Sequence, residues 1–335
     1  SHYCIIGLGK RGFCKTRENI DGKLYTLVYG AAIHRGSNDP IEKKPLYHFW
    51  PGSMAFSIAT VGCNFRCKHC QNWEISQSFP NESGRMAEFS PQDQNLAQSF
   101  PLTEITPESV IKAVKRLGSH SIAYTYNEPT IWFEFIKDTA ILAKKEGIYN
   151  ILVTNGYSSN EANEEFVQFI DAANVDIKAF SDDFYRRVVG VPSFKPVLDT
   201  CRFFKKHGIH LEITTLLIPN ENDKVDELKD LVEWVAQNLG IDTPMHFSAY
   251  HPDYRLDQPQ TSASLLLKAY DIAHAAGILN VFIGNIRSEK GSNSYCSNCH
   301  AILIERVGYS INNINLDESG KCRKCMQKSG IKGKF

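Results

Sequence analysis

The sequence has no excess of charge of either sign. Its 37 lysines and arginines balance 37 aspartates and glutamates, so no bulk field draws the chain to nucleic acid or to an anionic lipid surface. No apolar run reaches the roughly 20 residues that a transmembrane helix needs. The first residues lack a secretory signal pattern, and internal repeats are absent. We therefore expect a cytoplasmic protein with no membrane span and no nucleic acid partner.

Cysteine, by contrast, is abundant. Nine of the ten cysteines fall in three groups: Cys4 and Cys14; Cys63, Cys67 and Cys70; Cys296, Cys299, Cys322 and Cys325. A secreted disulfide framework is a poor explanation in a chain of this length without an export signal, so the groups indicate metal ligands. Cys201 stands alone in an apolar pattern and is expected to be a small buried hydrophobe.

From about residue 53 onward, short β-branched and aromatic runs alternate with helical patterns. The expected strands are 54–61, 121–126, 148–154, 174–180, 209–218, 245–250 and 279–284. Their mostly apolar character is typical of strands buried on both faces. The repeated β-α order predicts parallel strands with right-handed crossovers.

Polar residues cluster after or near the end of these strands. They are Asn127 and Glu128, Thr154 and Asn155, Asp176 and Lys178, Glu212 and Thr214, His251, and Asn285. The cysteines Cys63, Cys67 and Cys70 follow the first strand in the same way. Seven consecutive strand ends with polar groups suit a barrel better than a doubly wound sheet with one switch point. The fold class expected is α/β, a partial (β/α)6-type TIM barrel of six to seven parallel strands.

Three parts of the chain are expected. Residues 1–50 form an N-terminal cysteine-containing extension, 51–286 the partial barrel, and 287–335 a small C-terminal Cys4 metal-binding domain. Within the barrel part, segment 80–105 is polar and punctuated by prolines, which predicts a long loop that serves as a lid or a partner surface.

The cysteines after the first strand, Cys63, Cys67 and Cys70, have the spacing C-x3-C-x2-C. Iron–sulfur clusters are normally held by four thiolates, so three would leave one iron of a four-iron cluster open to a small molecule. Catalytic zinc likewise keeps three protein ligands and a water. The ligand count alone leaves both sites open.

The spacing and its place after a strand resemble the signature of the radical S-adenosylmethionine (radical SAM) superfamily. The resemblance implies a [4Fe–4S] cluster on Cys63, Cys67 and Cys70, with its fourth iron chelated by the amino and carboxylate groups of SAM. It implies reductive cleavage of SAM to a 5′-deoxyadenosyl radical, which abstracts hydrogen from a substrate, and a one-electron reductant of flavodoxin or ferredoxin type. The protein must position these groups and exclude water and oxygen.

Two further segments resemble strands that bind SAM in this superfamily. "YTYNEPT" (124–130) lies where a Gly-Gly-Glu-like motif is found, which implies that Glu128 holds the SAM amino group; Tyr126 and Asn127 replace the glycines. "VDIKAF" (175–180) resembles an Asp-x-Lys strand and implies Lys178 at the SAM carboxylate. The alternative is that Glu128 and Lys178 pair with each other or cap helices.

Three more contacts to SAM follow from the same resemblance. "VTNGY" (153–157) implies Asn155 near SAM, and "SAYHPDY" (248–254) implies His251 near the ribose or adenine. His69 precedes the last cysteine of the motif, where an aromatic residue near the adenine is usual. A merely tolerated loop residue is an equal alternative for His69.

The C-terminal cysteines form two C-x2-C pairs separated by 22 residues: Cys296, Cys299, Cys322 and Cys325. Four thiolates predict one metal site; structural zinc is favoured, with an auxiliary iron–sulfur cluster or a single iron as the alternatives. A tail of about 45 residues can bury only a small apolar core, so it needs a metal site to be stable. The segment between the pairs can form a short hairpin.

At the other end, Cys4 and Cys14 do not complete a metal site. They are either part of a site completed by further residues or reduced structural thiols.

The whole chain is similar to the radical SAM member of the AmmeMemoRadiSam system, which resembles pyruvate formate-lyase activating enzymes. The similarity rests on "GKRGFCKTRENIDGKLYTLVYG", "GCNFRCKHCQNWEIS", "DIKAFSDDFYRRV" and the cysteine-rich tail. It implies Memo-like and AMMECR-domain partner proteins.

Two substrate classes stay open for such an enzyme: a glycyl-radical enzyme that it activates, and a small or lipid-like molecule. A zinc-binding regulatory or nucleic-acid-binding protein would explain the tail but not the polar strand ends.

Overall fold

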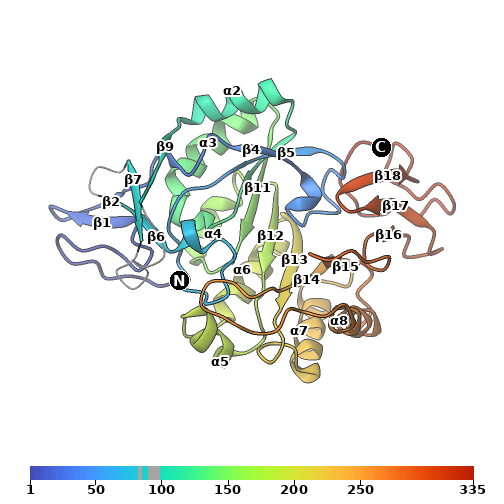
Figure 1. Cartoon of the computed structure of the whole chain (residues 1–335). Helices are drawn as coiled ribbons and strands as arrows, with labels where there is room; N and C mark the ends of the chain where they lie inside the picture. Colours follow the sequence, from blue (N-terminus) through green and yellow to red (C-terminus); the bar gives the residue numbers. More distant parts are fainter. Residues whose placement is uncertain (82–84, 90–98) are drawn as a thin grey trace.

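The computed structural model describes residues 1–81, 85–89 and 99–335 (Figure 1). Its main sheet has eight strands in the order β15-β14-β13-β12-β11-β10-β5-β4. Seven of them run parallel: β5 (Met54–Ile58), β10 (Ser121–Tyr124), β11 (Tyr149–Thr154), β12 (Ala172–Asp176), β13 (His210–Leu217), β14 (Met245–Ala249) and β15 (Val281–Gly284). β4 (Ser37–Pro40) pairs antiparallel with β5 at one edge.

The seven parallel strands pair in the order in which they occur in the chain, so the sheet has no switch point. That order is the one a barrel requires and a doubly wound sheet lacks. Because β15 and β4 are the two edges, the barrel is partial. The predicted fold class is confirmed, and the antiparallel edge strand β4 is an addition that the sequence pattern did not indicate.

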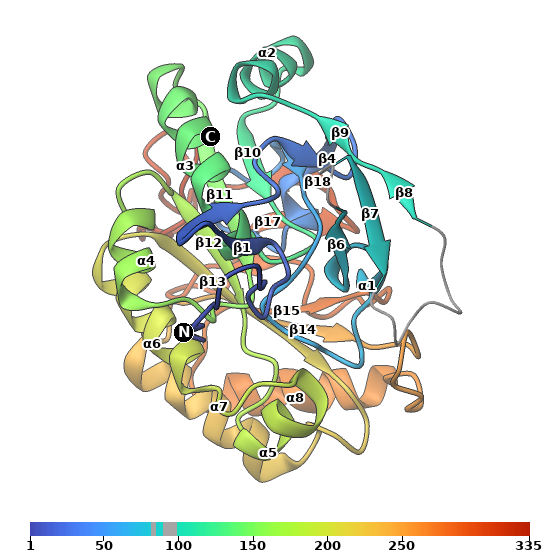
Figure 2. The ribbon, with the colours of Figure 1, turned by 90° about the vertical axis from the view of Figure 1, so that its left-hand side faces the viewer.

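Six longer helices lie outside the curved sheet (Figure 2): α2 (Pro107–Leu117), α3 (Phe133–Lys145), α4 (Asn160–Phe166), α6 (Lys195–Lys206), α7 (Val225–Asn238) and α8 (Ala263–Ala275). α2 begins at Thr106, whose hydroxyl accepts a hydrogen bond from the backbone of Ser109, and ends at the left-handed Gly118. These signals are those of a capped helix. Shorter turns are η1 (Ile41–Lys43), α1 (Trp73–Ser76), η3 (Pro129–Trp132), α5 (Asp182–Phe184) and the π-helical η4 (Tyr185–Val189).

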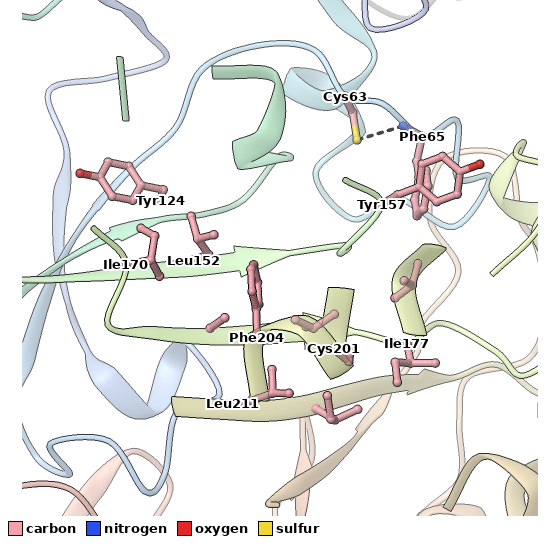
Figure 3. Packing of buried hydrophobic residues seen from close by; sticks show 14 of the residues in the cluster. Cys63, Phe65, Tyr124, Leu152, Tyr157, Ile170, Ile177, Cys201, Phe204 and Leu211 are labelled. Carbon is pink, nitrogen blue, oxygen red and sulfur yellow. Dashed lines mark hydrogen bonds between the residues drawn. The ribbon is translucent and has the colours of Figure 1, made fainter. Parts of the chain in front are cut away.

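The core lies between the strands and these helices (Figure 3). Leu152 of β11 and Leu211 of β13 pack there with Phe204 of α6. Cys201, on the same helix, is fully buried in this cluster, as expected for a small hydrophobe. The packing fixes the strands, and with them the positions of the loops that follow each strand.

The segment predicted to be one long loop contains short strands. β6 (Ser78–Pro80), β7 (Met86–Phe89) and β8 (Phe100–Pro101) form an antiparallel sheet, and β9 (Thr103–Glu104) pairs with β3 (Ala31–Ala32). For the described residues the loop prediction was therefore wrong, because pairing with distant segments is not visible in a polar local pattern. Residues 82–84 and 90–98 lie outside the described part.

Two small sheets lie on opposite sides of the barrel (Figure 1). β1 (Arg17–Ile20) and β2 (Lys23–Thr26) form a hairpin on one side. On the other, β16 (Ser294–Tyr295), β17 (Ile302–Val307) and β18 (Ser310–Ile314) form a sheet with its own apolar cluster. β17 and β18 are the hairpin predicted between the C-terminal cysteine pairs. In the described part of the chain, no helix combines the length and apolarity needed to cross a bilayer.

Candidate active site

A cavity of about 310 Å³ lies at the carboxyl ends of the parallel strands. Its walls come from the loops after β5, β10, β11 and β12 and from the ends of later strands. The structure brings together in this cavity the residues Cys63, Cys67, His69, Cys70, Glu128, Asn155 and Lys178. Of the predicted SAM-binding residues, only His251 is not among its lining.

The three cysteines lie on a loop of residues 62–72, here called the cysteine loop. Backbone hydrogen bonds tie it to η4: the amides of Arg66 and Lys68 donate to the carbonyls of Val189 and Val188 over 2.9 and 2.8 Å. The Asn127 side chain donates to the carbonyl of Gly62. A loop held from several sides keeps its ligands in place before a cofactor arrives, which is what a preorganised site needs.

The two metal hypotheses differ in how closely the sulfur atoms must approach. A tetrahedral ion with Zn–S bonds near 2.3 Å holds its sulfurs about 3.8 Å apart. Among the described residues, the Sγ atoms of Cys63, Cys67 and Cys70 do not all lie within 4.8 Å of one another. The unliganded thiols are therefore not arranged as they would be around a single ion.

Glu128 is buried and caps η3. Its Oε1 accepts hydrogen bonds from the amide and hydroxyl of Thr130 and from the Thr154 hydroxyl, at 2.6–2.9 Å. Its Oε2 accepts one, from the Asn155 amide at 2.8 Å. Burial raises the pKa of Glu128 despite these donors. The carboxylate forms no salt bridge within the described residues, and Oε2 can accept a further donor.

Lys178 does not pair with Glu128. Its Nζ lies 3.0 Å from Oδ2 of Asp176, two residues earlier in the chain. Burial disfavours the ammonium, but the charge of Asp176, the nearby Cys67 and the hydrogen bond to Asp176 together outweigh burial and raise the pKa of Lys178. Lys178 therefore stays positive next to Cys67, whose thiol pKa burial raises to about 12. Of the two alternatives to SAM binding, one is observed and the other is not. Glu128 caps the turn η3, but Glu128 and Lys178 do not pair with each other, since Lys178 pairs with Asp176.

Asn155 links the cysteine loop to β11. Its Nδ2 donates to Oδ1 of Asn64 over 2.7 Å and lies 3.9 Å from Sγ of Cys63. Two other polar atoms of the cavity residues, Nδ1 of His69 and Oγ1 of Thr214, are buried without a partner. Burial, with the nearby charge of Lys178, lowers the pKa of His69 to about 3, so the ring is neutral. Orphaned polar atoms in a cavity call for a ligand that satisfies them.

His251 lies at the rim of the cavity and is exposed to solvent. Its Nδ1 is 3.1 Å from Nε2 of Gln71, and Gln71 itself lines the cavity. His251 therefore contacts a cavity residue, Gln71, but does not itself line the cavity.

The sequence analysis missed a cluster on the cavity wall formed by Asp39, Lys43, Lys44 and Tyr126. Asp39 accepts from Lys43 and Lys44 at 2.9 and 2.8 Å. The Tyr126 hydroxyl also donates to it, over 2.9 Å. Burial alone would raise the pKa of Asp39, but the hydrogen bonds from the two lysines outweigh it and lower that pKa. A Lys-Lys pair before a proline gave no sequence signal, because its partners are 4 to 82 positions away.

Tyr126 has φ of 71°, in the left-handed region that glycine favours. A non-glycine residue there costs roughly 1–2 kcal/mol. The tyrosine therefore adopts a backbone conformation that a glycine would adopt without strain. Its ring lies 4.7 Å from Nζ of Lys44, and this cation–π contact offsets part of the strain.

The C-terminal cysteines converge to a tighter geometry than the cysteine loop. The sulfurs of Cys296, Cys299, Cys322 and Cys325 all lie within 4.8 Å of one another. Cys296 and Cys325 are 3.5 Å apart, and Cys299 and Cys322 are 3.7 Å apart. These separations match the edges of a tetrahedral tetrathiolate site. They suit either zinc or a single iron.

The N-terminal pair forms no such group among the described residues. Cys4 is exposed, while Cys14 packs against the core beside the cysteine loop and accepts a hydrogen bond from Thr16 at 3.1 Å.

Glu212 was expected near the active end of its strand, and this was wrong. It is the third residue of β13 and lies at the opposite end of the barrel. Its carboxylate accepts from the amides of Tyr47 and His48 and from the rings of His210 and His246, at 2.7–3.0 Å. In an eight-residue strand, the local sequence pattern does not indicate whether a polar residue lies near the amino end or the carboxyl end of the barrel.

Comparison with known proteins agrees with this geometry. The chain is 43% identical over 331 residues to an uncharacterized protein of Methanocaldococcus jannaschii, which covers 98% of this chain and 93% of that protein. It is 22% identical over 209 residues to the pyruvate formate-lyase 1-activating enzyme of Escherichia coli, covering 60% of this chain and 75% of the enzyme. A radical SAM methyltransferase from Sphaerobacter thermophilus shares the fold, with a TM-score of 0.52, 17% identity, and coverage of 70% and 67% of the two chains.

The family assignment rests on a family model. The model of the radical SAM superfamily matches residues 57–235, more than half of the chain. The match begins within β5, includes the cysteine loop and the strand ends at Glu128, Asn155 and Lys178, and extends into α7. This superfamily uses an iron–sulfur cluster to cleave SAM. The chain belongs to the radical SAM superfamily.

Proposed function

We propose that Cys63, Cys67 and Cys70 hold a [4Fe–4S] cluster and that SAM binds beside it in the same cavity. The observation that carries this proposal is the convergence of the cysteine loop with Glu128, Asn155 and Lys178 from three successive strand ends on one cavity. The two orphaned polar atoms support a bound group in the cavity, and the three sulfurs are not arranged as they would be around a single ion. When bound, these cofactors supply a 5′-deoxyadenosyl radical that removes a hydrogen atom from the substrate.

The residues have complementary charges for the two ends of the SAM amino acid. Glu128 keeps one acceptor position free on Oε2, which suits the ammonium group, and this buried acid then gains a cation. Lys178 retains donors beyond the one directed at Asp176, which suits the carboxylate. Asn155 bridges Glu128 and the cysteine loop and so fixes their separation. Orientation of this kind can contribute several kcal/mol to catalysis.

We also propose that the C-terminal cysteines bind a structural metal, with zinc favoured. The small apolar cluster of that region includes Cys296 and Cys322 together with Leu303, Ile304 and Leu316. Such a core is too small to be stable without the metal. With a metal site in the tail, we divide the chain into an extension (1–50), a barrel (51–286) and a tail (287–335). We also propose a cytoplasmic location, which suits an oxygen-sensitive cluster.

A protein substrate is the second candidate, as in glycyl-radical enzyme activation. The distant similarity to a pyruvate formate-lyase activating enzyme favours it. A flavodoxin- or ferredoxin-type reductant would serve either substrate class. Memo-like and AMMECR-domain proteins are the partners that the similarity to the AmmeMemoRadiSam system implies.

The test is anaerobic reconstitution with iron and sulfide, followed by reduction and addition of SAM. We expect about four iron atoms and four sulfides bound by the cysteine loop, a change in the spectrum of the reduced cluster on SAM addition, and release of 5′-deoxyadenosine. The triple variant Cys63→Ser, Cys67→Ser, Cys70→Ser is expected to lose the cluster and keep the tail metal. Stoichiometric zinc in the cysteine loop of the reconstituted protein would contradict the proposal.

A further inference from the structure

The cavity has a second charged wall that the proposed SAM contacts do not use. Lys43, Lys44 and Tyr126 line it together with Glu128 and Lys178. Lys43 ends the turn η1, Lys44 follows it, and Tyr126 follows β10, so three residues from two distant segments meet here. Lys44 is buried, with 2% of its side chain exposed, whereas 46% of the Lys43 side chain is exposed.

This wall carries one positive charge more than its own carboxylate neutralises. Lys43 and Lys44 both donate to Asp39. Asp39 also accepts from the hydroxyls of Ser37, Ser57 and Tyr126. Two ammonium groups therefore share one carboxylate.

The lysines still have hydrogen-bond donors to offer. An ammonium group has three N–H donors. Lys44 directs two of them to Asp39 and the Tyr126 hydroxyl, and Lys43 directs one to Asp39. The described residues offer these lysines no further acceptor. A buried ammonium with an unused donor at a cavity favours a bound acceptor.

Tyr126 holds the wall in shape. Its strained left-handed backbone places the ring against Lys44 and the hydroxyl on Asp39. A glycine would adopt the same backbone without strain but would leave Lys44 and Asp39 without these contacts. A strained residue at a cavity that organises charged neighbours is a sign of function.

We propose that Lys43, Lys44 and Tyr126 form a subsite for an oxyanion of the substrate, a carboxylate or a phosphate. The assignment rests on the proposed function, because it uses the cavity in which the radical would form. It restricts the substrate to a molecule or segment that carries an anionic group within reach of the hydrogen atom to be removed.

The probes are inorganic phosphate and acetate, titrated separately by calorimetry into anaerobically reconstituted protein saturated with SAM. We expect at least one of them to bind saturably with one site per chain. Lys43→Met should weaken that binding at least tenfold. The matched control is Lys137→Met, since Lys137 is similarly exposed and also pairs with a carboxylate, Glu165, but lies outside the cavity. Because Lys43 is half exposed, its removal is not expected to impair folding.

Saturable phosphate binding without acetate binding assigns a phosphoryl group, and the reverse assigns a carboxylate. No saturable binding of either anion, or equal binding by the Lys43→Met and Lys137→Met variants, overturns the subsite. If SAM abolishes anion binding seen in its absence, the wall belongs to SAM and the inference is wrong. Failure of the parent to bind SAM would instead overturn the proposed function and this assignment with it.

Discussion

Replacing Glu128 by glutamine tests the proposed SAM site at its most buried charge. The carboxylate has four donors around it, three on Oε1 and one on Oε2. Glutamine has one oxygen and one NH2 group, so it cannot accept from both sides. If its oxygen stays with Thr130 and Thr154, its NH2 group faces the Asn155 amide, which is also a donor.

The expected loss has two parts. A SAM ammonium would lose a charge-assisted hydrogen bond, which costs roughly 1.5–3 kcal/mol, or about ten- to a hundredfold in affinity. The donor left without an acceptor costs a further 1–3 kcal/mol of stability. Because this second cost applies with or without SAM, it lowers the free energy of unfolding rather than the affinity. Glu128→Gln should thus bind iron as the parent does, unfold at lower urea concentration, and bind SAM at least tenfold more weakly.

The assay is a spectroscopic titration of the reduced, reconstituted protein with SAM, with iron and sulfide measured on the same samples. Glu165→Gln is the control, since Glu165 is an exposed partner of Lys137 and lies outside the cavity. Binding of SAM by Glu128→Gln within about twofold of the parent would refute the role of this carboxylate, even if the cluster assignment holds.

Three further outcomes are expected. Lys178→Met should retain its iron but bind SAM about tenfold or more weakly in the same titration; unchanged affinity would reject its assigned contact. Cys322→Ser should lose the tail metal, measured by elemental analysis, and expose the tail to proteolysis while the main cluster still assembles; loss of SAM cleavage with the tail metal retained would contradict a structural role. Burial lowers the pKa of His48 to about 3, so the unfolded chain binds a proton that the folded chain does not. The contribution of His48 to the unfolding free energy should therefore fall by about 1.7 kcal/mol as pH drops from about 6.5 to 5. The unfolding free energy measured with urea should depend less on pH in His48→Gln than in the parent. The same pH dependence in both proteins would refute this.

The features that could be predicted from the sequence are those that local pattern and chain order determine. Apolar strands alternating with helices indicated the barrel, and polar residues placed directly after β10, β11 and β12 were brought to one cavity. This worked because parallel strands share one carboxyl end. The convergence of the C-terminal cysteines was predictable for a similar reason: two short knuckles joined by a hairpin have few ways to arrange four thiolates.

The features that could not be predicted depend on contacts between distant segments. Asp39 and Tyr126 are 87 positions apart, and nothing near Lys44 indicates that its ammonium lies at a cavity. The one available signal was Tyr126, because a tyrosine in place of a motif glycine has to keep the left-handed backbone or move the loop. Tyr126 has the left-handed backbone conformation, so the tyrosine adds a side chain to the site while its backbone stays in a region that glycine favours.

The polar network at the amino end of the barrel has the same long-range character and explains how the tail is attached. Arg306 of β17 is buried and donates to the carbonyl of Tyr47, whose own amide donates to Glu212. It also donates to Ser294, which meets the ring of His48 at 2.9 Å. Because buried charges are costly unless paired, the barrel carboxylate and the tail arginine each depend on the same backbone segment. The tail is therefore attached to the amino end of the barrel through Tyr47 and His48, which contact both Glu212 and residues of the tail.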